Sequence, residues 1–169
     1  MAAIGAGVLT RHGEALAAGE AVSSEIVNDA WKEQLGHSKL PNISPAEAGA
    51  HLANISGQNA LTLYAHYTTD TAGHRGQLPG GVAALERVDE FLGGVSDQLG
   101  PDMLLLIASD HGNLEDVTLS HTTNPVLGIA SGPGTERAST IRDIRDICPF
   151  VLDMLGIPNH YPVAPPVRT

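Results

Sequence analysis

Two short apolar runs flank a long amphipathic stretch, and this arrangement constrains the fold more than any other feature of the chain. Residues 60–65 and 103–108 are short and apolar, as buried strands are. Residues 80–99 carry an apolar helical stripe made of Leu85, Val88, Phe91, Leu92, Val95 and Leu99. A strand–helix–strand unit of this kind implies parallel pairing with a right-handed crossover. The sequence therefore predicts an α/β fold, with a mostly parallel sheet sandwiched by helices.

Capping residues predict two helices before the first apolar run. Residues 23–35 show one apolar helical face, so we expect a helix capped by Ser23 or Ser24. Ser44 opens a capping box with proline at the first helical position, which predicts a second helix to about Ile55.

The C-terminal part continues the alternation of strands and helices. Residues 125–131 are a candidate third strand. Residues 141–155 have a helical pattern in which Pro149 predicts a break. We expect a single domain over residues 1–169, in which residues 1–20 are poorly determined because they show little periodicity.

The charge balance narrows the classes of partner. The 169 residues carry a net charge of −10, which argues against binding to nucleic-acid backbones or anionic membranes and favours divalent cations. No apolar run approaches the roughly 20 residues of a spanning helix, and residues 1–9 do not have the pattern of a signal peptide. The one cysteine, Cys148, cannot form an intrachain disulfide, so we expect a cytoplasmic protein.

Side chains that bind metal ions follow both apolar runs. After the first run, Asp70 and His74 are four residues apart, so one helical turn would place them on the same side. After the second run come Asp110 and His111, and His121 follows ten residues later. Loops at the carboxyl ends of parallel strands build the sites of open α/β sheets. Three imidazoles and two carboxylates suit Zn²⁺ or Mn²⁺.

Each of these segments alone is weak evidence, because an isolated Asp-His pair in a loop is usually a solvated turn. Their joint appearance at consecutive strand ends favours a site. His66 lies close to the first loop and is expected to support the structure or a ligand. The other histidines lie in segments without partner ligands and are expected on the surface or on helices: His12, His37, His51 and His160.

Four motif segments follow one another between residues 60 and 158. Residues 70–76 read Asp-Thr-Ala-Gly-His-Arg-Gly. Residues 108–113 read Ala-Ser-Asp-His-Gly-Asn, and residues 121–126 read His-Thr-Thr-Asn-Pro-Val. Residues 146–158 contain Asp-Ile-Cys-Pro and end in Gly-Ile-Pro. Together they resemble the C-terminal part of the cofactor-independent phosphoglycerate mutases, a family of the alkaline phosphatase superfamily.

The resemblance implies a phosphoryl-transfer site with two divalent metal ions. The positions that match the family's ligands are Asp70, His74 and His121 for one ion, and Asp110 and His111 for the other. Two such ions can hold the attacking and leaving oxygens of a phosphoryl group. The implied substrate is a small phosphorylated molecule, and the family's nucleophile is a Ser or Thr that forms a phosphoenzyme.

The family's nucleophile and a further metal-binding Asp have no recognisable match in the sequence. Asp29 falls in a predicted helix, and Thr10, Ser23 and Ser24 follow no predicted strand. The catalytic residue therefore stays unassigned. The chain resembles the C-terminal portion of a longer enzyme, and the N-terminal strands of that enzyme have no match in this sequence.

Departures from the mutase pattern leave several functions open. Thr68-Thr69 and Leu127 stand where the mutases have other residues, so phosphatase or phosphodiesterase activity fits as well as mutase activity. Arg75 is a candidate for holding a substrate phosphate. Without a nucleophile, the chain could instead be a non-catalytic metal-binding or assembly module, or a purely structural domain.

A sheet that lacks its N-terminal strands would leave one edge uncovered. Such an edge predicts a homodimer, or an N-terminal segment that covers the edge.

Overall fold

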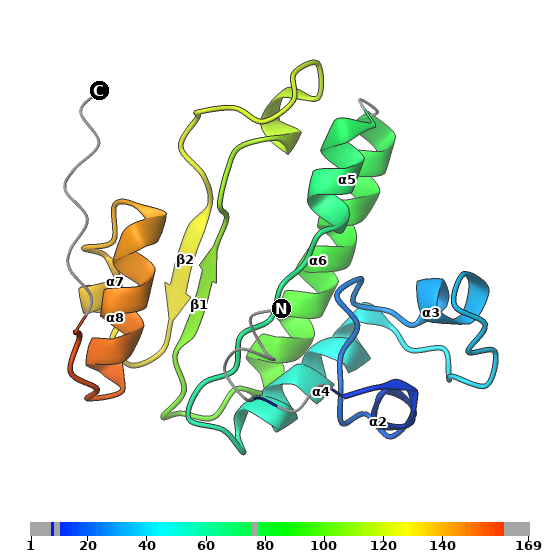
Figure 1. Ribbon diagram of the computed structural model, residues 1–169, viewed down its shortest axis with the longest axis horizontal. Coiled ribbons are helices and arrows are strands. Elements are labelled where there is room, and N and C mark those ends of the chain that lie inside the picture. The colour runs from blue at the N-terminus through cyan, green and yellow to red at the C-terminus, as the bar shows by residue number, and fades with distance from the viewer. Residues whose placement is uncertain (1–7, 9–10, 76–77, 161–169) are drawn as a thin grey trace. The chain divides into compact units, whose positions relative to one another are not determined.

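Helices provide most of the regular structure, and one short sheet accompanies them (Figure 1). The computed structural model describes residues 8, 11–75 and 78–160. In the segment 1–20, predicted to be poorly determined, residues 1–7 and 9–10 lie outside the described residues, and α2 (Gly13–Ala17) lies within them. No helix in the described part of the chain is long and apolar enough to cross a membrane.

The chain divides into two compact units. Unit 1 comprises Met1–Gly100 and Asn113–Ser120, and unit 2 comprises Pro101–Gly112 and His121–Thr169. The elements of unit 1 are α2 (Gly13–Ala17), α3 (Asp29–Glu33), α4 (Pro45–Ser56), α5 (Thr68–His74), α6 (Leu78–Gln98) and the 3₁₀ turn η1 (Leu114–Asp116). Those of unit 2 are β1 (Leu105–Ala108), β2 (Gly128–Ser131), α7 (Thr135–Ala138), the 3₁₀ turn η2 (Ile144–Asp146) and α8 (Ile147–Met154). Helices and strands both occur, as an α/β protein requires.

A capping box starts α4, as predicted. The Glu47 backbone N–H donates to Ser44 Oγ at 3.2 Å, and the Ser44 backbone N–H donates to Glu47 Oε2 at 2.7 Å. These two bonds satisfy amide groups that have no partner inside the helix. The bonds from Ser44 also lower the pKa of the Glu47 carboxyl.

Glycines set the contact between α4 and α6, which lie side by side in unit 1 (Figure 1). A methyl group on Gly49 of α4 would collide with the backbone carbonyl of Phe91. A methyl group on Gly94 of α6 would collide with the backbone carbonyl of Ala46. The two backbones therefore approach more closely than side chains at these positions would allow.

The predicted apolar stripe of α6 is partly wrong. Phe91 and Val95 are buried, as predicted. The buried face otherwise runs through small residues, Gly81, Ala84 and Gly94. Leu85 is 52% exposed because the close contact at the glycines turns the small face of α6 inward.

The helix predicted over residues 23–35 is wrong in its first half. Only α3 is helical, and Ile26 has a φ of 72°, in the left-handed region that interrupts a helix. Ile26 is fully buried, so burial of this side chain outweighs the helical pattern. Ser23 does not cap a helix; its Oγ accepts the Glu25 backbone N–H at 3.2 Å within a turn.

The strand predicted over residues 60–65 has no strand partner among the described residues, so this prediction is wrong. The side chains alternate between partly buried and exposed, and Leu63 is 88% exposed. Side-chain bonds hold the segment instead, since Tyr64 OH donates to the carbonyl of Ser23 at 2.7 Å. Burial raises the pKa of Tyr64 to about 12.

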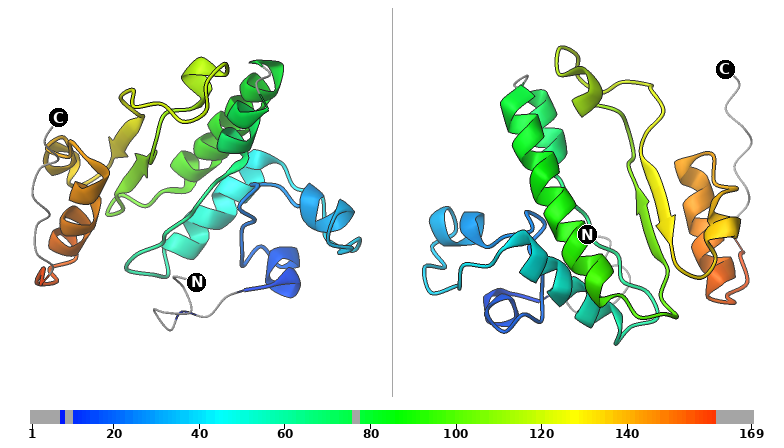
Figure 2. Two further views of the ribbon diagram at one scale, coloured as in Figure 1. Left: turned by 45° about the horizontal axis from the view of Figure 1, so that its top comes forward. Right: turned by 180° about the vertical axis from the view of Figure 1, so that it is seen from behind.

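β1 and β2 form the sheet of unit 2, which Figure 2 shows from two sides. Both lie within predicted strands, but they pair antiparallel, with Leu105 opposite Ser131 and Ala108 opposite Gly128. The parallel pairing expected from a helical crossover is therefore not found between the described strands. β1 pairs with the strand that follows it, and residues 60–65, the expected parallel partner, form no described strand.

Pro149 does not break the last helix, contrary to the prediction. The break falls earlier, where η2 gives way to α8 after Asp146. Pro149 is the third residue of α8, where a backbone N–H has no partner within the helix in any case.

Candidate metal centre

A short helix of unit 1 brings Asp70 and His74 together. Both lie on α5, and one turn separates them, so that Asp70 Oδ1 is 3.3 Å from His74 Nε2. Both side chains are about 40% exposed, at 40% and 43%. The proximity predicted from the four-residue spacing is confirmed, and a carboxylate and an imidazole share one helical face.

Asn113, also in unit 1, contacts the same carboxylate. Its Nδ2 donates to Asp70 Oδ1 at 2.6 Å and to the Asp70 backbone carbonyl at 3.2 Å. Its backbone N–H donates to Glu115 Oε2 at 2.7 Å. The sequence motifs assigned no role to Asn113, although it directly follows Asp110, His111 and Gly112.

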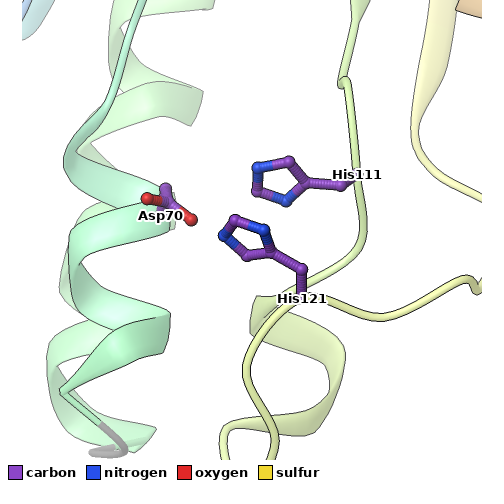
Figure 3. A group of neighbouring side chains, drawn as sticks. All are labelled: Asp70, His111 and His121. Atoms are coloured by element: carbon purple, nitrogen blue, oxygen red, sulfur yellow. The ribbon is translucent and has the colours of Figure 1, made fainter.

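Unit 2 brings together the remaining three predicted ligands. The imidazole rings of His111 and His121 stack, with centroids 3.6 Å apart and planes at 21° (Figure 3). An isolated bridge between Gly112 and Thr122 holds the two segments side by side, and the Thr122 backbone N–H donates to the Gly112 carbonyl at 2.8 Å. Asp110 Oδ1 lies 3.6 Å from His111 Nε2. Figure 3 also draws Asp70 on α5 of unit 1.

The donor atoms suit a transition-metal ion. Imidazole nitrogen suits Zn²⁺, and carboxylate oxygen extends the choice to Mn²⁺. The second nitrogen of a metal-binding histidine is usually held by a carboxylate or a carbonyl. His74 and His111 each lie beside a carboxylate, that of Asp70 and that of Asp110, so each unit brings an imidazole and a carboxylate together.

Arg75 follows α5 and lies at a shallow hollow. The hollow has a volume of about 200 Å³ and is lined by Thr68, Thr71, Ala72, Arg75 and Gly80. Arg75 is exposed, so a guanidinium is available at the end of the helix that carries Asp70 and His74.

His66 supports the structure of unit 1. Its Nδ1 lies 2.8 Å from the carbonyl oxygen of Ser24, and burial lowers the pKa of the ring. The remaining histidines lie outside the segments that carry the candidate ligands. His37 lies beside Trp31, with ring centroids 5.1 Å apart, and His51 lies on α4.

Comparison with protein families decides what kind of domain this is. The family model of the metalloenzyme superfamily matches residues 38–159. The chain belongs to this superfamily. The matched residues include all five candidate ligands: Asp70, His74, Asp110, His111 and His121. Membership of the metalloenzyme superfamily implies divalent metal cofactors and confirms the resemblance stated for the sequence motifs.

Curated relatives within the superfamily are 2,3-bisphosphoglycerate-independent phosphoglycerate mutases. The one from Desulforudis audaxviator is 34% identical over 130 residues, which cover 70% of this chain and 25% of the relative. The one from Cereibacter sphaeroides is 31% identical over 132 residues, covering 70% and 26%, and the one from Halobacterium salinarum is 31% identical over 125 residues, covering 68% and 25%. The chain thus spans about a quarter of the length of these relatives. No solved structure matches it significantly.

Proposed function

We propose that this member of the metalloenzyme superfamily forms part of a metal-dependent phosphoryl-transfer enzyme. The observation that carries the proposal is the pairing of ligands in each unit: Asp70 with His74 on α5, and His111 with His121 after β1. All four lie in the region that matches the superfamily. The mutases to which the chain is similar transfer a phosphoryl group, which favours this chemistry over other metal-dependent reactions.

The proposed ligands are Asp70, His74 and His121 for one ion, and Asp110 and His111 for a second. All five positions lie within the residues that match the superfamily. Mn²⁺ or Zn²⁺ fits this donor set, and two such ions would stabilise the charge that develops on a transferring phosphoryl group.

The proposed substrate is a small phosphorylated molecule, in keeping with the relatives. The exposed guanidinium of Arg75, at the end of α5, is suited to hold a phosphate oxygen.

We assign the nucleophile, and a further Asp ligand, to a segment of a longer protein, because the chain corresponds to only about a quarter of the length of its relatives. Mutase, phosphatase and phosphodiesterase reactions of this kind all begin with attack of a nucleophile on the phosphorus of the substrate.

The sheet of unit 2 is proposed to receive further strands. β1 and β2 have four residues each, and a two-stranded sheet is marginally stable alone. Ile129 and the preceding Val126 and Leu127 are exposed. An N-terminal segment that supplies strands parallel to β1, or a second copy of the chain, would cover this surface. The single cysteine, Cys148, fits a reducing compartment such as the cytoplasm.

Metal titration of the 169-residue chain tests the ligand assignment. We expect Mn²⁺ or Zn²⁺ to bind in isothermal titration calorimetry. His74→Ala and Asp110→Ala each remove a ligand, so they should weaken binding by at least the roughly 10–100-fold typical of losing a residue that merely supports one. His160→Ala, an exposed histidine outside the ligand segments, is the matched control. Unchanged affinity in both ligand variants would falsify the assignment.

Turnover of para-nitrophenyl phosphate by the metal-loaded chain separates the two classes of function. Hydrolysis that His74→Ala abolishes supports an enzyme that is active by itself. Metal binding without hydrolysis is expected if the nucleophile lies in another segment of a longer protein. Hydrolysis after addition of the N-terminal part of a relative then supports the enzyme class, and no hydrolysis in either case favours the non-catalytic metal-binding or assembly module.

A further inference from the structure

Asn113 is a buried amide whose orientation is fixed by its partners. The residue is only 6% exposed. Both hydrogen bonds of Nδ2 go to oxygens of Asp70, at 2.6 Å to Oδ1 and 3.2 Å to the backbone carbonyl. Because both partners are acceptors, the nitrogen of the amide must face them and the oxygen must face away. Of the two carboxylate oxygens of Asp70, Asn113 therefore binds Oδ1.

The oxygen of the amide, Asn113 Oδ1, lies against α5 at Gly73. Asn113 Oδ1 is buried without a hydrogen-bond partner among the described residues. It lies so close to Gly73 that a methyl group there would overlap it. A glycine at position 73 thus lets the amide reach Asp70, because any side chain there would occupy the same space.

The backbone of Asn113 is held as well. Its N–H donates to Glu115 Oε2 at 2.7 Å, which starts the 3₁₀ turn η1. Leu114 packs on α6, because a Cβ added at Gly81 would lie 3.0 Å from Leu114 Cδ2. The amide that contacts Asp70 is consequently fixed at its backbone and at its side chain.

We propose that Asn113 is a positioning residue, which orients the carboxylate of Asp70 for a metal ion. The inference rests on the proposed function, in which Asp70 is a ligand. A neutral amide orients a carboxylate without cancelling its charge, whereas a Lys or Arg in the same place would compete with the cation. An ionised carboxylate has about four lone-pair sites, so an accepted hydrogen bond leaves capacity for a metal ion.

Calorimetry with Mn²⁺ on the full chain tests the role of Asn113. Asn113→Ala should weaken Mn²⁺ binding by roughly 10–100-fold, as loss of a group that orients a ligand does. Asn59→Ala is the control, because Asn59 Nδ2 also donates to a backbone carbonyl, that of Ile55, on an exposed surface. In an Asp70→Ala background, Asn113→Ala should cause no further loss, because its effect passes through Asp70.

Two results would overturn the positioning role. One is wild-type affinity in Asn113→Ala while Asp70→Ala still loses binding; the proposed function then stands. The other is an equal loss with and without Asp70, which would indicate packing alone. If Asp70→Ala binds as the wild type does, the ligand assignment fails and the positioning role fails with it.

A metal-free measurement keeps the test decisive if Asn113→Ala does not fold or the wild-type chain binds no Mn²⁺. The side-chain amide protons of Asn113 should exchange slowly in nuclear magnetic resonance spectra of the wild-type chain, and at least about tenfold faster in Asp70→Ala. Equal exchange in the two proteins overturns the inference. Slow exchange in a chain that binds no metal would show that the hydrogen bond to Asp70 forms, but the proposed function would fail, and with it the role of this bond in metal binding.

Discussion

Gly73 shows how one missing side chain shapes the neighbourhood of a candidate ligand. It lies on α5 between Asp70 and His74, and its Cα faces the buried amide of Asn113. In an isolated helix, alanine is more favourable than glycine by roughly 1 kcal/mol. The glycine is therefore explained by its neighbour rather than by the helix, because only a residue without a Cβ leaves room for Asn113.

This explanation predicts a rescue. Gly73→Ala should destabilise the chain by about 1–3 kcal/mol in urea unfolding, because the added methyl overlaps the Asn113 amide. In an Asn113→Ala background the same change should be neutral or stabilising by up to roughly 1 kcal/mol, because the obstacle is gone and helix propensity improves. Gly80→Ala on α6, where nothing lies within 4 Å, is the control. Equal destabilisation by Gly73→Ala in both backgrounds would contradict this account.

At the scale of elements, small residues decide which face of α6 is buried. A stripe of large apolar side chains predicts the buried face of most amphipathic helices. In α6 that rule identifies Phe91 and Val95 but not the close approach at Gly94, where the backbone of α4 arrives. Leu85 is left exposed, because close contact of two helices needs small residues at the crossing more than it needs large ones.

Two adjacent glycines of α6 allow a direct comparison. Gly94→Ala should lower the free energy of unfolding by about 1–3 kcal/mol, since its methyl would meet the Ala46 carbonyl. Gly93→Ala should raise it by up to roughly 1 kcal/mol, because nothing lies within 4 Å of that position and alanine favours the helix. Urea unfolding of both variants measures the difference. A stabilised Gly94→Ala would show that the α4–α6 contact is looser than described.

At the scale of the molecule, the buried apolar side chains are unevenly shared between the units. Among the described residues, the buried apolar side chain of unit 2 is Ala138 alone, whereas the others, such as Ile26, Phe91 and Val95, lie in unit 1. Local stability follows buried apolar contacts. Unit 1 therefore has an apolar core of its own. The stability of unit 2 depends more on the proposed cover of its sheet, an N-terminal segment or a second copy of the chain.

Hydrogen exchange should reveal this asymmetry. We expect amides of α4 and α6 to exchange at least about tenfold more slowly than those of β1 and β2 at low protein concentration, a difference of about 1.4 kcal/mol in opening free energy. If a second copy covers the sheet, protection of β2 should rise with protein concentration while that of α4 stays constant. Equal protection of both units at low concentration would refute the asymmetry.

Local sequence patterns are enough to predict the elements that short-range interactions control. The capping box at Ser44 starts α4, and the four-residue spacing of Asp70 and His74 places both on one turn of α5, because capping bonds and helical periodicity act within a few residues. The motifs also identified the superfamily, since residue types at fixed spacing are what a family model compares.

Tertiary structure alone decided the features that depend on distant segments. Burial of Ile26 replaced a predicted helix with a turn, and strand pairing within unit 2 made the sheet antiparallel. The bond from Asn113 to Asp70 joins residues 43 positions apart. No local pattern encodes such a contact, because its free energy comes from burying and pairing groups that only the folded chain brings together.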